Sequence, residues 1–274
     1  MTTTLRPAEP LQQNADGTRS RHYQVCVNSR PVGAIHIGTD PVFGDAVARI
    51  MTLRIQEADR RRGRGTVAAL AAEEVARGWG CRRIEVSVPA RSAAGLRLAT
   101  ALGYVVRNRN MEKDLGDTAP ALPEGSRVRP MTDAEFGPYL EQGKTDYAHS
   151  WSERGVPGAE ARAKSERDHA ALLPDGRTSE GMLFSVLEHE GTPVGTLWLS
   201  VRGQGAYVFD VETSARHRGR GHGRTLMLTA EAQAIAAGRR RIGLNVFADN
   251  TPAERLYDSL GYTTTQYAMY KPLL

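Results

Sequence analysis

The sequence of 274 residues lacks the features that mark several classes of protein. It has only two cysteines, Cys26 and Cys81, too few for a disulfide framework, and no zinc-type spacing. No apolar run approaches the roughly 18 residues of a membrane span, and the N-terminus has no hydrophobic stretch typical of a signal peptide. We therefore expect a cytoplasmic protein without a metal site or a membrane partner.

Aromatic residues are also scarce, at 6% of the chain, and only four of the 36 basic residues are lysine. A net charge of +5 permits nucleic-acid binding, which needs a basic stripe with stacking or readout groups. The arginines gather instead in two glycine-rich turns, at 60–65 and 216–224, without interleaved aromatic residues. We therefore expect no nucleic-acid partner.

The most informative feature that is present is an internal repeat. Residues 61–65 (Arg-Arg-Gly-Arg-Gly) resemble 217–221 (His-Arg-Gly-Arg-Gly) at an offset of 156, whereas the Leu-Gly-Tyr at 102–104 recurs at 260–262, an offset of 158. This change of offset predicts a two-residue gap between the copies. Proline and glycine dominate 116–125, so we predict one domain at 1–118 and a second at 119–274.

The second copy predicts a mixture of helices and strands. Thr132-Asp133-Ala134-Glu135 resembles a capping box, and Pro252 suits the first position of a helix. Helices are expected from about 132 and at 158–172, 221–237 and 252–260; strands are expected at 127–129, 183–188, 194–201, 206–213, 242–247 and 262–270. The first copy has no counterpart of the opening strand and first two helices, so we expect it to be shorter.

A glycine-rich turn at 218–224 lies between a predicted strand and an amphipathic helix. Glycines let the backbone approach a ligand closely and turn several N–H groups in one direction. The N-terminus of the following helix adds the positive end of its dipole. The combination predicts an anion site suited to a pyrophosphate, although a glycine-rich turn alone also occurs as a plain tight turn.

Two longer blocks, at 210–227 and 244–262, resemble the GNAT N-acetyltransferase family. In the first block the family's Arg/Gln-x-x-Gly-x-Gly falls on Arg218, Gly221 and Gly223. The resemblance is good over the second copy and weaker over the first. It implies an α+β fold of two tandem GNAT-type acyl-CoA N-acyltransferase domains. Each would have a mixed, twisted sheet flanked by helices and splayed by a bulge in the fourth strand.

The same resemblance implies that acetyl-CoA is the co-substrate. Its pantetheine arm would lie beside the splayed strand, and its pyrophosphate would rest on the glycine-rich turn. The residues implied to contact the coenzyme are Val211, Thr213, Arg218, Gly219, Arg220, Gly221, His222, Gly223, Arg224, Asn245 and Asn250.

The family transfers the acetyl group directly to an amine while both reactants are bound. Such a reaction needs a base for the amine, an acid for the departing thiolate and a backbone donor for the carbonyl oxygen. The resemblance implies that Glu212 is the base and Tyr257 the acid. Asp210, two residues before Glu212, points to the same face of the strand and is the alternative base or a contact for the amine.

The offsets predict that the first copy has lost this chemistry. An offset of 156 places Val67 opposite Gly223 and puts Gln56 at the position of the base. An offset of 158 places Ala99 opposite Tyr257. We therefore expect a degenerate first domain that serves as a scaffold.

The expected activity is acetyl-CoA-dependent transfer to the primary amine of a small-molecule acceptor. The alternatives are a mycothiol synthase-like acetyltransferase, whose acceptor is a cysteinyl aminosugar, and a non-catalytic module that senses acyl-CoA or binds a partner. The acceptor is expected to meet the helices at about 133–173, which carry Tyr139, Tyr147 and Trp151. We expect a monomer, because paired copies can substitute internally for a dimer, with a homodimer as the alternative.

Overall fold

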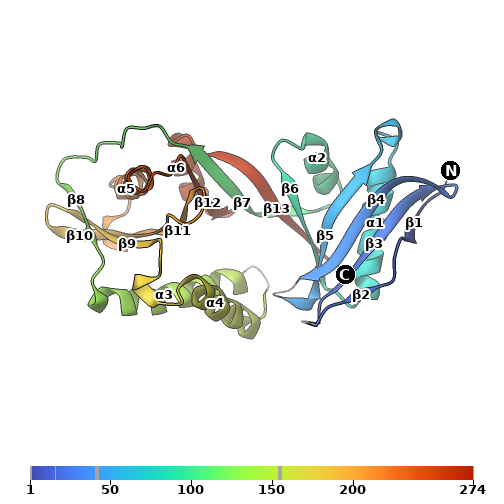
Figure 1. Cartoon of the computed structure of the whole chain (residues 1–274), viewed down its shortest axis with the longest axis horizontal. Coiled ribbons are helices and arrows are strands. Elements are labelled where there is room, and N and C mark those ends of the chain that lie inside the picture. The colour runs from blue at the N-terminus through green and yellow to red at the C-terminus, as the bar shows by residue number, and fades with distance from the viewer. Residues whose placement is uncertain (1, 16, 41–42, 154–155, 274) are drawn as a thin grey trace. The chain divides into compact units, whose positions relative to one another are not determined.

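The structure, a computed structural model, describes residues 2–15, 17–40, 43–153 and 156–273 (Figure 1). The chain forms two compact units. Unit 1 comprises Met1–Arg109, Phe247–Asp249 and Thr264–Leu274, and unit 2 comprises Asn110–Val246 and Asn250–Thr263. Each unit therefore takes its last strand from the other half of the sequence. The boundary predicted after residue 118 divides the two sequence repeats. The compact units are divided differently, because each includes segments from both repeats, and the predicted boundary stays a prediction.

Unit 1 is built on a mixed sheet with the strand order β1-β3-β4-β5-β6-β13, and β2 pairs with β3. Only β5 and β6 are parallel, while β13 joins antiparallel to β6. The strands are β1 (Thr3–Pro7), β2 (Gln12–Gln13), β3 (Arg19–Val27), β4 (Arg30–Asp40), β5 (Gly44–Ile55), β6 (Arg83–Pro89) and β13 (Thr263–Pro272). The helices are the 3₁₀ turn η1 (Glu57–Asp59), α1 (Arg64–Gly78) and α2 (Ala93–Ala101).

Unit 2 has the strand order β7-β12-β11-β10-β9-β8, with β11 and β12 parallel and β8 to β11 antiparallel. Its strands are β7 (Val105–Asp114, from Asn110 on), β8 (Ser126–Pro130), β9 (Met182–His189), β10 (Thr192–Ser200), β11 (Ala206–Thr213) and β12 (Arg241–Phe247). Its helices are α3 (Asp133–Ser152), α4 (Gly158–Leu172), α5 (His222–Ala236) and α6 (Thr251–Ser259), with 3₁₀ turns η2 (Gly176–Thr178) and η3 (Ala215–His217). The predicted α+β class with mixed sheets and flanking helices is confirmed.

Alternation along β10 gives the sheet of unit 2 two apolar faces. Leu197 and Leu199 are buried against α5 and α6, in a core that includes Leu226 of α5. Trp198 points to the opposite face, where it packs with Phe184 in a core that α3 covers. The sheet is therefore sandwiched between helices. Among the described residues, no helix is both long and apolar enough to cross a membrane.

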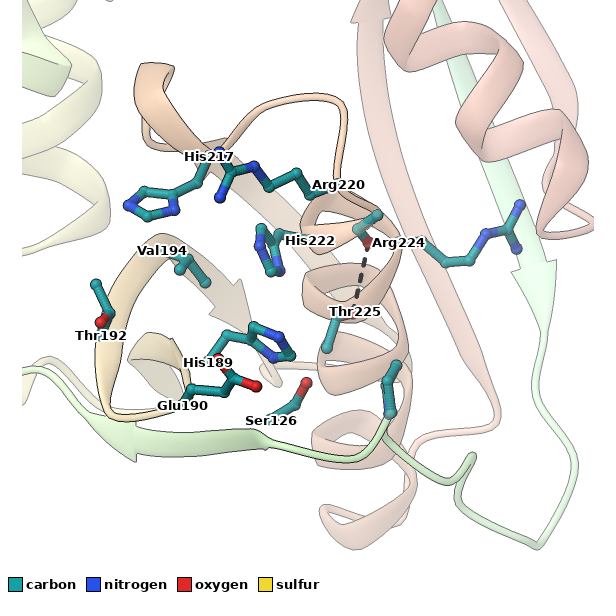
Figure 2. Close-up of a pocket in the computed structure, with 12 residues that line it drawn as sticks. Ser126, His189, Glu190, Thr192, Val194, His217, Arg220, His222, Arg224 and Thr225 are labelled. Carbon is teal, nitrogen blue, oxygen red and sulfur yellow. Dashed lines mark hydrogen bonds between the residues drawn. The ribbon is translucent and has the colours of Figure 1, made fainter.

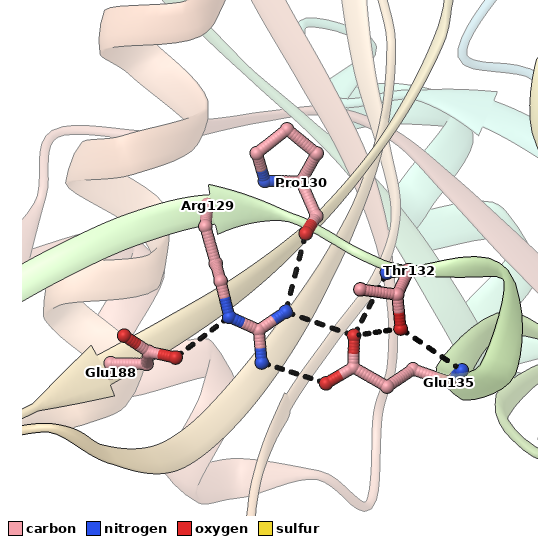
Figure 3. A network of polar contacts seen from close by, with 5 residues as sticks. All are labelled: Arg129, Pro130, Thr132, Glu135 and Glu188. Atoms are coloured by element: carbon pink, nitrogen blue, oxygen red, sulfur yellow. Dashed lines mark hydrogen bonds and ion pairs between the residues drawn. The ribbon is translucent and has the colours of Figure 1, made fainter.

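The start of α3 is held by a network around Arg129 of β8 (Figure 3). Thr132 and Glu135 form the predicted capping box, because each side chain bonds the backbone N–H of the other. The guanidinium of Arg129 also donates to both carboxylate oxygens of Glu135, at 2.7 and 2.9 Å, and to Glu188 of β9 at 2.7 Å. This network fixes α3 against the sheet, and α3 supplies one wall of the site described below.

The predicted two-residue gap between the repeats is wrong. Gly63 and Gly221 are the left-handed N-caps of α1 and α5, and these helices keep one offset of 158 from start to end. The strands before them share this offset, because Ile55 opposes Gly33 as Thr213 opposes Gly195. Matching the glycines gave the wrong offset of 156, because Arg61 adopts a left-handed conformation where a glycine is expected. Gly219 fills the corresponding place in the second copy.

The corrected register changes which residues correspond. Gly65, not Val67, is the counterpart of Gly223, so the first copy has kept the glycine that it was expected to have lost. Arg54, not Gln56, is the unit 1 counterpart of Glu212, and Thr52 is the counterpart of Asp210. Ala99 still corresponds to Tyr257, because α2 and α6 share the same offset.

The prediction that the first copy lacks the opening strand is wrong. Strand β1 pairs antiparallel with β3 in unit 1 as β8 pairs with β9 in unit 2. The two helices α3 and α4 have no counterpart among the described residues of unit 1.

Candidate active site

The glycine-rich turn of unit 2 has the backbone shape that an anion site needs. Gly219 and Gly221 adopt left-handed conformations, with φ of 75° and 86°. Gly221 caps α5 without any side-chain hydrogen bond, so the N–H groups of the first helical turn remain available at the helix end. An anion placed there would also meet the positive end of the helix dipole.

Gly223 lies on the side of α5 that faces β11 and α6. A Cβ atom added to it would lie 3.4 Å from the side chain of Leu256 and 3.7 Å from the hydroxyl of Thr213. The missing side chain therefore leaves room between the strand and the two helices. Leu256 is followed on α6 by Tyr257.

A bulge in β11 opens the sheet beside this space. Trp198 opposes Asp210 while Leu199 opposes Val208, so Phe209 is the extra residue. The parallel pairing of β11 with β12 covers Ala206 to Val208 only. Beyond the bulge, β11 and β12 make no further ladder pairs among the described residues, so the edge of β11 near 211–213 is open towards an extended ligand. The expected splayed strand is therefore present, and the geometry fits the pantetheine arm of a coenzyme.

Asp210 is the most strongly perturbed acid at this place. Its carboxylate is half-buried and accepts a hydrogen bond of 2.9 Å from the hydroxyl of Tyr139 on α3. Burial raises the pKa of Asp210 to about 6; the hydrogen bond from Tyr139 lowers it, nearby Glu212 raises it, and the N–H of Val211 lowers it. A carboxyl group with this pKa exchanges its proton close to neutral pH.

Glu212 has a different environment. Its side chain is exposed, and one carboxylate oxygen lies 3.9 Å from the guanidinium of Arg218. Arg218 also donates to the carbonyl oxygen of Thr213 at 3.2 Å. Because Glu212 raises the pKa of both Tyr139 and Asp210, it lies on their side of the sheet, as predicted from the strand alternation.

Tyr257 is buried in the core between α6 and the sheet, with its ring 6.0 Å from that of Tyr262. Burial, followed by the charge of Asp210, raises the pKa of Tyr257 to about 12. The phenol is therefore protonated at neutral pH and can donate a proton. The charge of Asp210 thus acts on the phenol of Tyr257 across the sheet.

The remaining predicted residues surround the turn or the strand edge. Asn250 caps α6 by accepting from the N–H of Ala253 at 3.2 Å, while the Asn245 amide donates to Asn110 of β7 at 2.6 Å. Arg224 donates to the hydroxyl of Ser259 at the end of α6. Three others (Arg220, Gly221 and His222) line a cavity beside the turn, shown in Figure 2.

The sequence predicts Tyr139 only as a residue of the helices that the acceptor is expected to meet. Its bond to Asp210 joins residues 71 positions apart, and no local spacing reveals such a contact. The other aromatic residues singled out on α3 are engaged in packing. Tyr147 donates to Asp168 of α4, and Trp151 is buried with the ammonium of Lys164 5.0 Å from its ring.

The two units repeat one arrangement of a glycine-rich turn after a strand with a register shift, and the chain matches the acetyltransferase (GNAT) family over residues 2–104 and 145–262. The chain belongs to this family, its repeats form a tandem pair, and the protein is an acyltransferase enzyme. The family uses acetyl-CoA as co-substrate.

Individual relatives agree with this assignment. The N-acetyltransferase YycN of Bacillus subtilis is 31% identical over 152 residues, which are 53% of this chain and 97% of that protein. A mycothiol acetyltransferase of Beutenbergia cavernae is 29% identical and aligns over 90% of this chain and 82% of its own length. A GNAT structure from Sphaerobacter thermophilus has a TM-score of 0.60 at 20% identity, covering 92% of this chain and 80% of that one, which supports the fold.

Proposed function

We propose that unit 2 transfers the acetyl group of acetyl-CoA to the primary amine of a small molecule, with both substrates bound at once. The observation that carries this proposal is the hydrogen bond from Tyr139 to Asp210 at the splayed strand, in a unit that also buries the phenol of Tyr257 on α6. The carboxyl group has a pKa near neutral pH, and the charge of Asp210 helps to keep the phenol protonated. These are the two proton-transfer roles that aminolysis of a thioester requires.

Acetyl-CoA, when bound, would supply the activated acetyl thioester. Its pyrophosphate would be held by the turn from Arg218 to Arg224 and its pantetheine arm by the backbone of Val211 and Thr213. The open strand edge and the missing side chain at Gly223 support this placement. The amine acceptor would approach on the side of Asp210 that α3 covers, since Tyr139 of α3 bonds that carboxylate.

The chemistry needs two proton transfers. Asp210 takes a proton from the acceptor amine, whose nitrogen forms the new bond to the acetyl carbon. Tyr257 gives its proton to the sulfur as the carbon–sulfur bond breaks. Asp210 is preferred to Glu212 as the base, because Glu212 is exposed and beside Arg218. Glu212 would then attract the cationic amine towards the site.

Thiol release from acetyl-CoA, measured with a panel of small primary amines, tests this proposal. Release that requires an amine, with the acetylated amine identified by mass spectrometry, is the expected result. Binding of acetyl-CoA that no amine discharges would instead favour a non-catalytic coenzyme-sensing module. The panel includes a cysteinyl aminosugar, because similarity to mycothiol acetyltransferases extends over both repeats. A preference for that acceptor would identify the mycothiol-type alternative.

A further inference from the structure

A cavity of about 480 Å³ lies beside the N-terminus of α5, next to the turn between β9 and β10. Three histidines from three different elements line it: His189 at the end of β9, His217 in η3 and His222 at the start of α5 (Figure 2). The ring of His222 lies 5.1 Å from that of His189 and 6.2 Å from that of His217. Arg220 also lines the cavity.

Two of these rings have polar atoms without a protein partner. His222 is only 6% exposed, and within the described part of the chain its ring makes contacts with the other two histidines but no hydrogen bond. The Nδ1 atom of His189 is buried and has no hydrogen-bond partner among the described residues. A buried polar atom such as Nδ1 of His189 usually has a partner, so a ligand that enters the cavity could supply it.

This cavity is on a different side of α5 from the space expected to hold the coenzyme. Gly223 faces Thr213 and Leu256, whereas His222, one residue earlier, faces His189. Consecutive residues point about 100° apart around a helix, at 3.6 residues per turn. The cavity therefore shares four turn residues with the expected coenzyme site, but it opens on a different side of α5 from the strand edge. The shared residues are Arg220, Gly221, His222 and Arg224.

The corresponding place in unit 1 is filled by an internal anion. Asp59, the counterpart of His217, is 2% exposed and pairs with Arg64 at the N-terminus of α1. It also accepts two hydrogen bonds from Arg30 of β4, at 2.9 and 3.1 Å. Arg64 corresponds to His222, because each is the first residue of its helix, α1 or α5. Arg30 corresponds to Thr192, because each is the first residue of its strand, β4 or β10. The first copy thus shows that a carboxylate is accommodated at this point of the fold.

At the corresponding place, the cavity of unit 2 has His222 and Thr192 as groups that can form hydrogen bonds. Its described lining residues include no buried carboxylate. Glu190, the one carboxylate among the described lining residues, is exposed on the β9–β10 turn. Burial, His189, His217 and Arg220 all lower the pKa of His222, in that order, so the surroundings repel added positive charge. A bound anion would remove this repulsion and would also meet the helix N-terminus.

We propose that this histidine-lined cavity is a binding site for a small molecule that carries a carboxylate or phosphate group, on a different side of α5 from the strand edge expected to hold the pantetheine arm. The anionic group occupies the place that Asp59 fills in unit 1. It accepts hydrogen bonds from His222 and His189 and lies near the guanidinium of Arg220. The rest of the cavity receives the remainder of the molecule.

The test follows the histidine ring protons by NMR while sodium acetate or sodium phosphate is added, with sodium chloride at equal ionic strength as the control. His189→Gln and His222→Gln spectra identify the two signals. We expect shifts of both signals that saturate with acetate or phosphate and not with chloride, in the absence and in the presence of saturating acetyl-CoA. Shifts that chloride reproduces overturn the site. So do shifts that acetyl-CoA abolishes, because the anion then occupies the coenzyme turn.

A His217→Asp variant copies the internal carboxylate of unit 1 and sharpens the test. We expect its apparent affinity for acetate and phosphate to fall at least about tenfold, while thermal melting followed by circular dichroism confirms a folded chain. Unchanged saturation in a folded variant contradicts the proposal. The titration without acetyl-CoA does not depend on catalysis, so this test stands even where no amine is acetylated.

Discussion

The glycine-rich turns of the two units have nearly the same backbone but different chemistry around them. Both have a left-handed glycine as the helix cap, at Gly63 and Gly221, and both follow a strand with a register shift. Unit 1 has Thr52 and Ala99 where unit 2 has Asp210 and Tyr257. Unit 1 has therefore kept the backbone of the turn without the carboxyl group and the phenol that we propose as base and acid in unit 2. Backbone geometry alone does not identify the catalytic copy.

Asp210→Asn should have the largest effect. The amide cannot accept the amine proton, so we expect kcat for thiol release to fall roughly 10²–10⁴-fold. Thr52→Asn, at the corresponding position of unit 1, should leave kcat within about twofold. Glu212→Gln should act mainly on KM, because this carboxylate is exposed. A larger loss of kcat in Glu212→Gln than in Asp210→Asn would return the role of base to Glu212.

Tyr257→Phe should lower kcat by about 10–10²-fold, less than loss of the base. Thiols have pKa values of about 8.5, so a thiolate can depart without being protonated. The amine needs a base more than the thiolate needs an acid. Ala99 already lacks the phenol at the same point of unit 1, so the variant makes the two sites alike in this respect. An unchanged kcat, measured where chemistry is rate-limiting, would exclude Tyr257 as the acid.

Gly223→Val should weaken acetyl-CoA binding by at least about tenfold, or about 1.4 kcal/mol, as measured by calorimetry. Gly65→Val is a matched control, because a Cβ atom at Gly65 meets Leu98 at 3.5 Å much as one at Gly223 meets Leu256 at 3.4 Å. Packing damage should thus be similar in the two variants. Full binding in Gly223→Val and loss in Gly65→Val would place the coenzyme in unit 1.

The pH profile distinguishes Asp210 from a merely structural acid. With a pKa of about 6, its carboxyl group becomes an active base as pH rises, so kcat/KM should increase through about pH 6. The hydrogen bond from Tyr139 lowers this pKa. Tyr139→Phe should therefore move the acidic limb to higher pH, with a larger loss of activity at pH 6 than at pH 8. An equal loss at both values would mean that Tyr139 affects packing only.

Local patterns in the sequence were sufficient for most of the second copy. The helix at 158–172 and the strand at 206–213 were predicted with their observed bounds, and the capping box at Thr132 is present. Long-range pairing was not predictable. The exchange of the last strands depends on contacts such as β13 with β6, and the Tyr139–Asp210 bond joins distant positions. The offset between the repeats was predicted wrongly because Arg61 adopts a left-handed backbone conformation that favours glycine.

The smallest predicted effect concerns the attachment of α3, which has no counterpart among the described residues of unit 1. Glu135→Ala removes the capping box and the Arg129 pair, and should lower the free energy of unfolding by about 1 kcal/mol. Glu141→Ala, which removes an exposed pair with Lys144 on the same helix, should cost at most about 0.5 kcal/mol. Urea unfolding measures both, and equal losses would argue against the network of Figure 3.

The difference in free energy of unfolding between wild type and Glu135→Ala should depend on pH with a definite sign. The Arg129 guanidinium, then the hydrogen bonds from Thr132, lower the pKa of Glu135 from 4.5 to about 2. A lowered pKa means that the folded chain favours the charged carboxylate, so its stabilising effect is complete above about pH 4.5. The advantage of wild type over Glu135→Ala should therefore be lost as pH falls from 4.5 through about 2. Because Glu135 is partly exposed, added salt should reduce the same advantage, and a difference insensitive to both pH and salt would point to helix packing instead of charge.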